Sequence, residues 1–463
     1  MLLHTSLEPL RWLGPWPSEN PDQTKDKTPP YPQSNVAVAN ALPCRKQNRS
    51  RLQDAQLDLM FERRIPEWLR HAPAPSVHGF GVLAGFEGIT RGMLISVFPL
   101  AMYNALGDAV AISQAYFFIG IGSLIVGLLV PALNKRIPRR WLYSFGTLCF
   151  IAGALLASLG TPMTLIFGLM LNSFATVITF ICFNAYVLDY IKRIELGRSE
   201  TLRLLYSALG WTLGPAVGVA LYTYNPVLPF YISAASSLGM LAAFTYMRLG
   251  NGKLITRAKR PAPNPLAFIG RFVQQPRLVA GFSFAVIRSC GWWAYIVYMP
   301  LYALKNGLPE QLGGFLMSGT NAALFLAPFM LRWMQKRSVR IAVRTGFAMA
   351  ASFFTLAFLL ADWPWVVIVT LFCASFFLIL LDISAGLPFL MAVKPSERTE
   401  MSTIYSSYRD VSGILTPGFA WGVLLVAPIS GVFLLAGAAL AIAYTVAGSV
   451  HPRLGEKRLV AAE

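Results

Sequence analysis

The sequence contains little charge. Only 13% of its 463 residues are Asp, Glu, Lys or Arg, whereas 55% are hydrophobic. A soluble globular domain carries about 25% charged residues, so half of the usual charge is missing and a soluble multidomain chain is excluded. The mean hydropathy is +0.54, and long apolar runs recur from Phe80 to Val450. This composition is typical of a membrane protein with many spans.

Motifs for several kinds of chemistry are missing as well. The five cysteines and four histidines are scattered, without the CxxC or Cys/His spacing of a metal site or disulfide framework. The sequence has no GxxxxGK[ST] loop for ATP, and no nucleophile–base constellation stands out. It therefore predicts neither an enzyme nor an ATP-driven pump, and it predicts no metal or organic cofactor.

Apolar runs of about 20 residues are long enough to cross a bilayer as α-helices. The chain contains twelve such runs, six in each half, near residues 80–103, 111–133, 141–159, 164–190, 205–223, 227–247, 278–303, 313–333, 341–361, 364–391, 403–426 and 430–449. The predicted fold class is an all-α, polytopic membrane protein with twelve transmembrane helices in two pseudo-symmetric six-helix bundles.

The formal net charge of +18 lies mostly in alternate loops. The positive-inside rule explains this pattern, so the charge does not indicate a nucleic-acid partner. The basic loops contain Lys135, Arg136, Arg139, Arg140, Lys192, Arg193, Arg198, Arg203, Arg332, Lys336, Arg337 and Arg340, whereas the loops between them offer Lys305 alone. We expect a multi-pass protein of the cell membrane (the inner membrane in a bacterium) with both termini cytoplasmic.

The predicted organisation follows from these spans. Residues 77–247 and 278–449 form the two bundles, 248–277 a basic cytoplasmic linker, and 450–463 a cytoplasmic tail. Residues 1–76 are polar and Pro-rich, which predicts a disordered cytoplasmic extension with an amphipathic surface helix at 51–70. No secretory signal pattern is present in this extension. An alternative is that translation starts downstream, for instance at Met60.

The two halves of the chain repeat each other at a spacing of about 200 residues, a feature typical of secondary transporters. LAGFEGITRG around Arg91 resembles VAGFSFAVIRS around Arg288, and Pro99 corresponds to Pro300. ALGWTLGPAVG around Gly210 likewise resembles VSGILTPGFAWG around Gly413. Parallel halves of this kind place a substrate site at their interface, near mid-bilayer.

Two motifs carry a resemblance to the major facilitator superfamily over residues 78–450. GLLVPALNKRIPRRW (127–141) resembles the family's G-x-L-x-D-R-x-G-R-R loop. It keeps the basic cluster Lys135, Arg136, Arg139 and Arg140 but lacks the acidic residue, so the resemblance implies a gating loop without the acidic member of the family's charge relay. GWTLGPAVG matches the family's antiporter-associated G-x-x-x-G-P-x-x-G through Gly210, Gly214, Pro215 and Gly218. The alternative reading is ordinary close packing of a glycine stripe.

Charged residues inside the spans are the candidate functional residues, because such residues usually face the protein interior or water. Counted along the helix, Arg91 and Arg288 lie roughly 15 Å deep in matching spans, so we expect an anion clamp between the halves. Glu87 stands one turn before Arg91 and is expected to pair with it. The alternative is that both arginines form structural ion pairs.

Other residues complete the predicted site. Asp382 is a proton-coupling carboxylate or a counter-ion of Arg288, and Asn184 occupies the corresponding position in the first half. Trp292 and Tyr295 follow Arg288 and either line the cavity or belong to the packing. Glu87 and Asp382 are the candidate proton sites.

The predicted function is alternating-access secondary transport of a small solute, expected to be a small organic anion. A proton or a counter-solute would be the coupling partner and the lipid bilayer the surroundings. One alternative is a proton-coupled drug efflux antiporter, in which Glu87 or Asp382 holds a hydrophobic cation. Another is a transporter-like receptor or scaffold without flux.

Overall fold

The computed structural model describes residues 76–191, 196–249, 268–393 and 397–448. The predicted N-terminal extension, its surface helix at 51–70, most of the linker and the C-terminal tail lie outside the described residues, as does the side chain of Lys135. The described part is helical and contains no strand. This confirms the all-α fold class.

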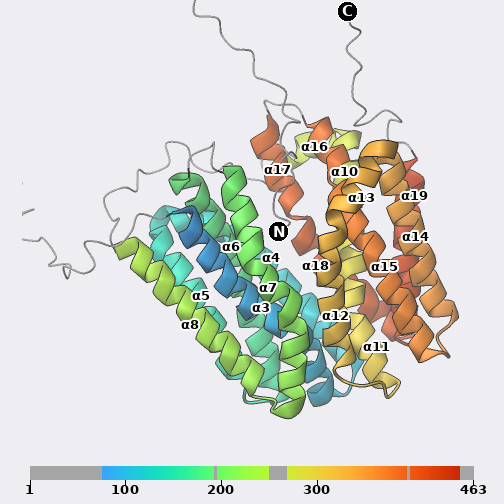
Figure 1. Ribbon diagram of the computed structural model, residues 1–463, viewed down its shortest axis with the longest axis horizontal. Helices are drawn as coiled ribbons and strands as arrows, with labels where there is room; N and C mark the ends of the chain where they lie inside the picture. Colours follow the sequence, from blue (N-terminus) through green and yellow to red (C-terminus); the bar gives the residue numbers. More distant parts are fainter. Residues whose placement is uncertain (1–75, 192–195, 250–267, 394–396, 449–463) are drawn as a thin grey trace, which may run out of the picture. The chain divides into compact units, whose positions relative to one another are not determined.

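The first half of the chain forms six long helices, drawn from blue to green in Figure 1. They are α3 (Val77–Leu106), α4 (Ala109–Arg136), α5 (Arg139–Ala157), α6 (Pro162–Tyr190), α7 (Leu196–Tyr224) and α8 (Leu228–Leu249). Local sequence sets their ends. Gly107 ends α3 with a φ of 66°, and Asp108 then caps α4 by accepting hydrogen bonds from the Val110 and Ala111 amides.

The second half contains more interruptions. A short helix, α9 (Ile269–Val273), precedes six helical stretches. These are α10 (Pro276–Trp293) with the π-turn Ala294–Tyr298 and α11 (Met299–Lys305); α12 (Leu312–Ala322) with the 3₁₀ turn Ala323–Leu326 and α13 (Ala327–Arg337); α14 (Val339–Leu359); α15 (Pro364–Ser384) with α16 (Leu387–Ala392); α17 (Arg398–Ser406) with α18 (Tyr408–Leu424); and α19 (Ser430–Ala447).

Among the described residues, ten helical stretches are long and apolar enough to span a membrane, including the interrupted stretches α12–α13 and α15–α16. The two remaining predicted spans, 278–303 and 403–426, correspond to the interrupted stretches α10–α11 and α17–α18. In the first, Pro300 lacks an N–H and its ring would meet the carbonyl of Ile296, which explains the π-turn just before it. Eight of the twelve predicted spans are thus continuous helices and four are interrupted stretches, two of which fall short of the length and hydropathy of a membrane span.

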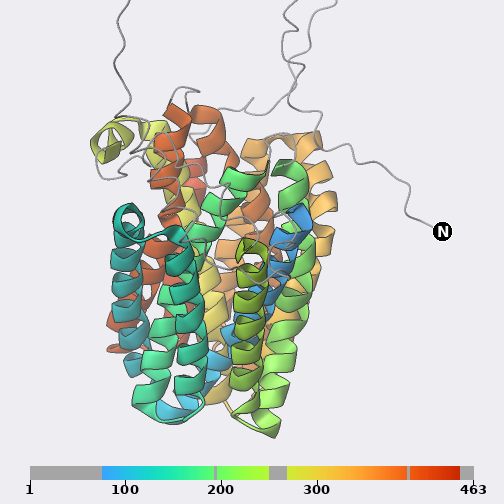
Figure 2. The same cartoon turned by 90° about the vertical axis from the view of Figure 1, so that its left-hand side faces the viewer.

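The two halves repeat one packing scheme. In the first half α3 packs on α7 and α8, and α5 packs on α6 and α8; in the second half α10 packs on α18 and α19, and α14 packs on α15 and α19. The long helices of both halves run along a common direction (Figures 1 and 2). We call the end that carries Arg136, Arg139, Arg337 and Arg340 the basic end.

Two seams join the halves, α4 against α18 and α7 against α12. In the α4–α18 seam a Cβ added at Gly120 would lie 2.7 Å from the Gly413 carbonyl oxygen, and Tyr116 packs edge-on against Trp293. Ser113 and Tyr298 also share a hydrogen bond of 2.9 Å across the halves. These residues lie in the half of the molecule away from the basic end.

In the other seam, α12 completes the hydrogen bonding of α7. Pro215 has no N–H to donate to the carbonyl of Trp211, one turn earlier. The side-chain amide of Asn321 donates to that carbonyl instead, at 2.6 Å, and Ser318 Oγ accepts from the Ala216 N–H at 2.9 Å. A buried backbone group without a partner costs about 1–3 kcal/mol, so these two hydrogen bonds help to hold α7 against the opposite half.

Candidate functional site

The glycine stripe of α7 positions the helix that carries Glu87 and Arg91. A Cβ added at Gly214 would lie 2.7 Å from the backbone carbon of Gly92, and one added at Gly210 would lie 2.5 Å from the Ile89 nitrogen. Only glycine permits this approach, so the backbones of α3 and α7 are in direct contact. Arg91 is thereby held beside Trp211, its Cζ 5.2 Å from the ring centroid.

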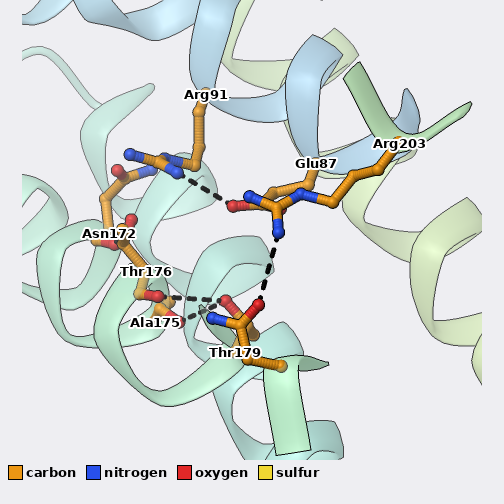
Figure 3. A network of polar contacts seen from close by, with 8 residues as sticks. Glu87, Arg91, Asn172, Ala175, Thr176, Thr179 and Arg203 are labelled. Carbon is orange, nitrogen blue, oxygen red and sulfur yellow. Dashed lines mark hydrogen bonds and ion pairs between the residues drawn. The ribbon is translucent and has the colours of Figure 1, made fainter. Parts of the chain in front are cut away.

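Glu87 and Arg91 form an ion pair within α3 (Figure 3). Arg91 Nη1 donates to Glu87 Oε1 at 2.8 Å, the pairing expected from their i,i+4 spacing. Both groups remain accessible, because 30% of the arginine side chain and 19% of the glutamate side chain are exposed. The ion pair is therefore only partly buried.

An unpaired donor on α6 appears in the same close-up (Figure 3). Asn172 Nδ2 is buried and has no hydrogen-bond partner among the described residues. A buried donor without a hydrogen-bond partner costs about 1–3 kcal/mol. Binding of a ligand whose oxygen accepts from Asn172 Nδ2 would therefore be favoured. The sequence analysis did not single out Asn172, since a lone amide inside an apolar run gives no signal of which way it points.

The second half holds its pair across two helices. Arg288 on α10 lies with Nε 3.0 Å from Asp382 Oδ1 on α15. The indole Nε1 of Trp292 donates to the other carboxylate oxygen at 3.0 Å. The arginine side chain is only 8% exposed, whereas that of the aspartate is 38% exposed. Asp382 thus pairs with Arg288, the contact that one of its two expected roles requires, and its side chain is partly exposed. Its part in proton coupling stays a prediction.

Arg91 and Arg288 each interact within their own half. Arg91 contacts α3 and α7, while Arg288 pairs with α15 and lies over the Tyr408 ring at 5.2 Å. No contact between the two arginines themselves is present in the described part of the chain. An anion held by both arginines remains a prediction.

The other predicted residues are distributed as follows. Asn184 Oδ1 accepts from Arg203 at 3.3 Å, and Tyr295 is fully buried, with its hydroxyl 2.8 Å from Thr320 Oγ1. Tyr295 is therefore part of the packing around α12. In the basic loop, Arg136 is exposed, and the guanidinium of Arg139 lies 5.5 Å from the Tyr186 ring. Arg140 stacks on its neighbour Trp141.

A second pair of arginines was not predicted as part of the site. Arg203 of α7 and Arg409 of α18 come from opposite halves, yet both lie over the ring of Phe180, at 5.9 and 5.6 Å. Arg409 also donates to the Tyr408 hydroxyl at 3.1 Å. Their positions near helix starts resemble loop charges in the sequence, and only the folded chain brings them to one aromatic ring.

Comparison with known proteins identifies the family. The sequence matches the Major Facilitator Superfamily over residues 80–417. The chain belongs to the major facilitator superfamily. It is accordingly a multi-pass membrane protein of the secondary-transporter class, not an enzyme. Among curated proteins, no significant match was found.

Solved structures of this superfamily share the fold. The nucleoside transporter NupG superposes with a TM-score of 0.62 at 13% identity, covering 81% of this chain and 98% of NupG. The peptide transporter POT, in complex with sulfate, gives 0.63 at 13% identity over 82% of this chain and 94% of POT. FucP, in its outward conformation, gives 0.52 at 14% identity over 81% and 98%. At these identities the likeness concerns the fold alone.

Proposed function

We propose that this member of the superfamily transports a small organic anion by alternating access, coupled to protons or to a counter-solute. One observation carries the proposal: each half sets an arginine against a carboxylate that is accessible, Glu87 at 19% and Asp382 at 38% exposed side chain. Guanidinium stays charged at any working pH and matches carboxylate or phosphate geometry. The clamp residues in this proposal are Arg91 and Arg288.

The carboxylates act as internal competitors for the arginines. In the empty transporter Glu87 and Asp382 neutralise Arg91 and Arg288. An incoming anion displaces them, or a proton discharges them, and in either case the guanidinium becomes available to the solute. Proton movement and anion movement are then linked through the same two ion pairs, or one anion replaces another.

Further donors would complete the anion site. Asn172 Nδ2 offers a buried donor that has no partner among the described residues, and Trp292 Nε1, now bound to Asp382, is freed when that carboxylate is displaced. Asn184 would act indirectly, by orienting Arg203. Tyr295 would support the site through its hydrogen bond to Thr320. The basic loop and the glycine–proline stretch of α7 would serve gating and helix packing.

The basic end of the bundle faces the cytoplasm in this proposal, which follows the positive-inside rule. The protein would then reside in the cell membrane with both termini in the cytoplasm. Accessibility of single introduced cysteines to a membrane-impermeant thiol reagent, at Leu133 near the basic end and at Leu425 near the other, would test this orientation. Labelling of Leu133→Cys in intact cells would contradict it.

Transport by purified protein in proteoliposomes tests the function. A panel of radiolabelled carboxylates, phosphate esters and sulfate would be offered with and without an imposed pH gradient. We expect Arg91→Gln and Arg288→Gln each to lower uptake of the transported anion at least about 100-fold, the loss of roughly 3 kcal/mol of charge-assisted binding. The control is Arg332→Gln, since Arg332 stacks on Phe329 of its own helix. Unimpaired transport in both arginine variants would refute the clamp.

Efflux of hydrophobic cations is the second candidate. The observation that favours it is the placement of Asp382, exposed and bound to the indole of Trp292, because a carboxylate beside an aromatic ring suits a cation. Deletion of the gene would then raise sensitivity to cationic drugs, and Asp382→Asn would fail to restore resistance. An anion phenotype with unchanged drug sensitivity would exclude this candidate.

A further inference from the structure

The charges of the four central arginines are balanced unequally. Arg91 and Arg288 each have a carboxylate within 3.0 Å. Arg203 has the side-chain oxygen of Asn184 and, at 3.3 Å, a carboxylate of Glu200 that is 55% exposed. Arg409 is exposed and donates to the Tyr408 hydroxyl; the Asp410 and Asp382 carboxylates act on it electrostatically, but neither forms a hydrogen bond with it among the described residues. An anion therefore meets less competition at Arg203 and Arg409 than at the other two.

The geometry leaves these two guanidinium groups able to bind. Each lies over the Phe180 ring, which attracts a cation through its face but cannot accept the in-plane N–H bonds. A guanidinium has five N–H donors in a planar fork. Neighbouring oxygens accept from Arg203 at Asn184 and Glu200, and from Arg409 at Tyr408, so each group keeps further donors for an oxyanion.

The two arginines belong to opposite halves. Arg203 is on α7 of the first half, and Arg409 is on the first turn of α18 of the second. Because the seams between the halves lie away from the basic end, these like charges meet at a level where the halves are less tightly joined. Their repulsion opposes closure there, and an anion accepting from both would reverse the sign of that interaction.

We propose that Arg203 and Arg409, which both contact the Phe180 ring, form an oxyanion site that bridges the two halves and closes the basic end when it is occupied. The ligand is the carboxylate, sulfate or phosphate group of a small anion. The proposal rests on the anion-transport function above and adds a site distinct from the Arg91–Arg288 clamp. Repulsion between the two guanidinium groups makes closure of the empty carrier unfavourable. A bound anion favours the closed state, because a ligand shifts the equilibrium toward the state it binds better. Exchange of anions is therefore favoured over one-way movement.

The test measures the distance across the basic end in the full-length protein. Spin labels are attached at Leu133→Cys on α4 and Met391→Cys on α16, both exposed, after the five native cysteines are replaced. Distances are recorded by pulsed electron resonance in sodium sulfate and in sodium chloride of equal ionic strength. We expect sulfate, and not chloride, to shift the distribution to shorter distances.

Variants locate the response. It should persist in the double variant Arg91→Gln/Arg288→Gln and in the control Arg332→Gln, and it should need about tenfold more sulfate, or vanish, in Arg203→Gln and in Arg409→Gln. Arg203→Lys, which keeps the charge, should retain most of the response and shows that a loss in Arg203→Gln is not misfolding.

Three results would overturn the site: no response of the wild-type protein to sulfate, an equal response to chloride, or a response lost in the Arg91/Arg288 variant but kept in Arg203→Gln. The last result would leave the transport proposal intact and assign the anion to the inner arginines. Loss of uptake in Arg91→Gln with an unchanged distance response would support both proposals and show that the clamp and the Arg203–Arg409 site are separate.

Discussion

The two halves of this transporter hold Arg91 and Arg288 in different ways. In the first half Glu87 and Arg91 are on one helix, so the pair moves as a rigid part of α3. In the second half Arg288 and Asp382 are on α10 and α15, so the 3.0 Å contact spans two helices. Any sliding of α10 past α15 stretches the second pair and leaves the first unchanged.

This difference separates two kinds of response. The pair in α3 changes only when a proton or an anion competes for it, because its geometry is set by helical spacing. The pair between α10 and α15 also changes with conformation, and its arginine is almost completely buried. The ion pair of the first half thus responds to ligand or proton alone, whereas the pair of the second half responds to ligand, proton and helix movement.

The largest expected effect comes from removing the carboxylate in the second half. Asp382→Asn leaves the guanidinium of Arg288 buried without a counter-ion, which typically costs about 3–5 kcal/mol. The matching Glu87→Gln should lower stability by less than about 1 kcal/mol, since 30% of Arg91 is exposed to water. Thermal unfolding of the purified protein in detergent measures both changes.

A double variant provides the control for this comparison. Arg288→Gln/Asp382→Asn removes both charges and should recover much of the stability lost in Asp382→Asn. If Asp382→Asn were as stable as the wild type, the guanidinium would have an alternative partner and the contrast between the halves would fail.

The next largest effect concerns corresponding glycines. A Cβ at Gly210 would lie 2.5 Å from the Ile89 nitrogen, a backbone atom that cannot give way. A Cβ at the corresponding Gly413 would lie 3.3 Å from Trp293 Cζ2, a side-chain atom that can. Gly210→Ala should therefore cost about 1–3 kcal/mol and Gly413→Ala less than about 1 kcal/mol. Equal melting temperatures for the two variants would contradict this reading of the α3–α7 contact.

A smaller effect is expected on anion affinity. Glu87→Gln removes the internal competitor of Arg91 and should tighten the apparent binding of the transported anion by about tenfold, or about 1.4 kcal/mol. The pH dependence of uptake should weaken in the same variant. Concentration series of uptake at two pH values provide both readouts, and a weaker apparent affinity would show that Glu87 helps to bind the solute.

The smallest effect is expected at the α7–α12 seam. Asn321→Ala removes the donor to the Trp211 carbonyl and should lower stability by about 1 kcal/mol. Pro215→Ala restores an N–H inside α7, so Asn321→Ala in that background should cost almost nothing. A double-mutant cycle measured by thermal unfolding checks the coupling, and additive effects of the two changes would refute it.

Much of the fold could be predicted from the sequence because lipid imposes a simple length rule on apolar helices. All twelve predicted spans correspond to helical stretches of the structure. The interruptions could not be predicted in the same way. The π-turn before Pro300 depends on how one proline meets the preceding carbonyl, whereas Pro99 in the corresponding span of the first half lies inside a continuous helix.

The candidate site was predictable only where its partners share a helix or where a charge is deep in a span. The Glu87–Arg91 pair follows from spacing alone. Pairing with Arg288 was one of the two roles that the sequence left open for Asp382, a carboxylate deep in its span. Arg203 and Arg409 gave no such signal, because charges near helix starts are ordinary in membrane proteins. Their common contact with Phe180 depends on the docking of two halves far apart in sequence.

The hydrogen bonds from Asn321 and Ser318 to the backbone of α7 have a consequence for biosynthesis. Until α12 is synthesised, the Trp211 carbonyl and the Ala216 amide have no partner from that helix. The nascent first bundle would enter the bilayer with the Trp211 carbonyl still lacking its donor, which lies on a helix about 100 residues later in the sequence. The hydrogen bonding of α7 is therefore complete only after α12 has docked.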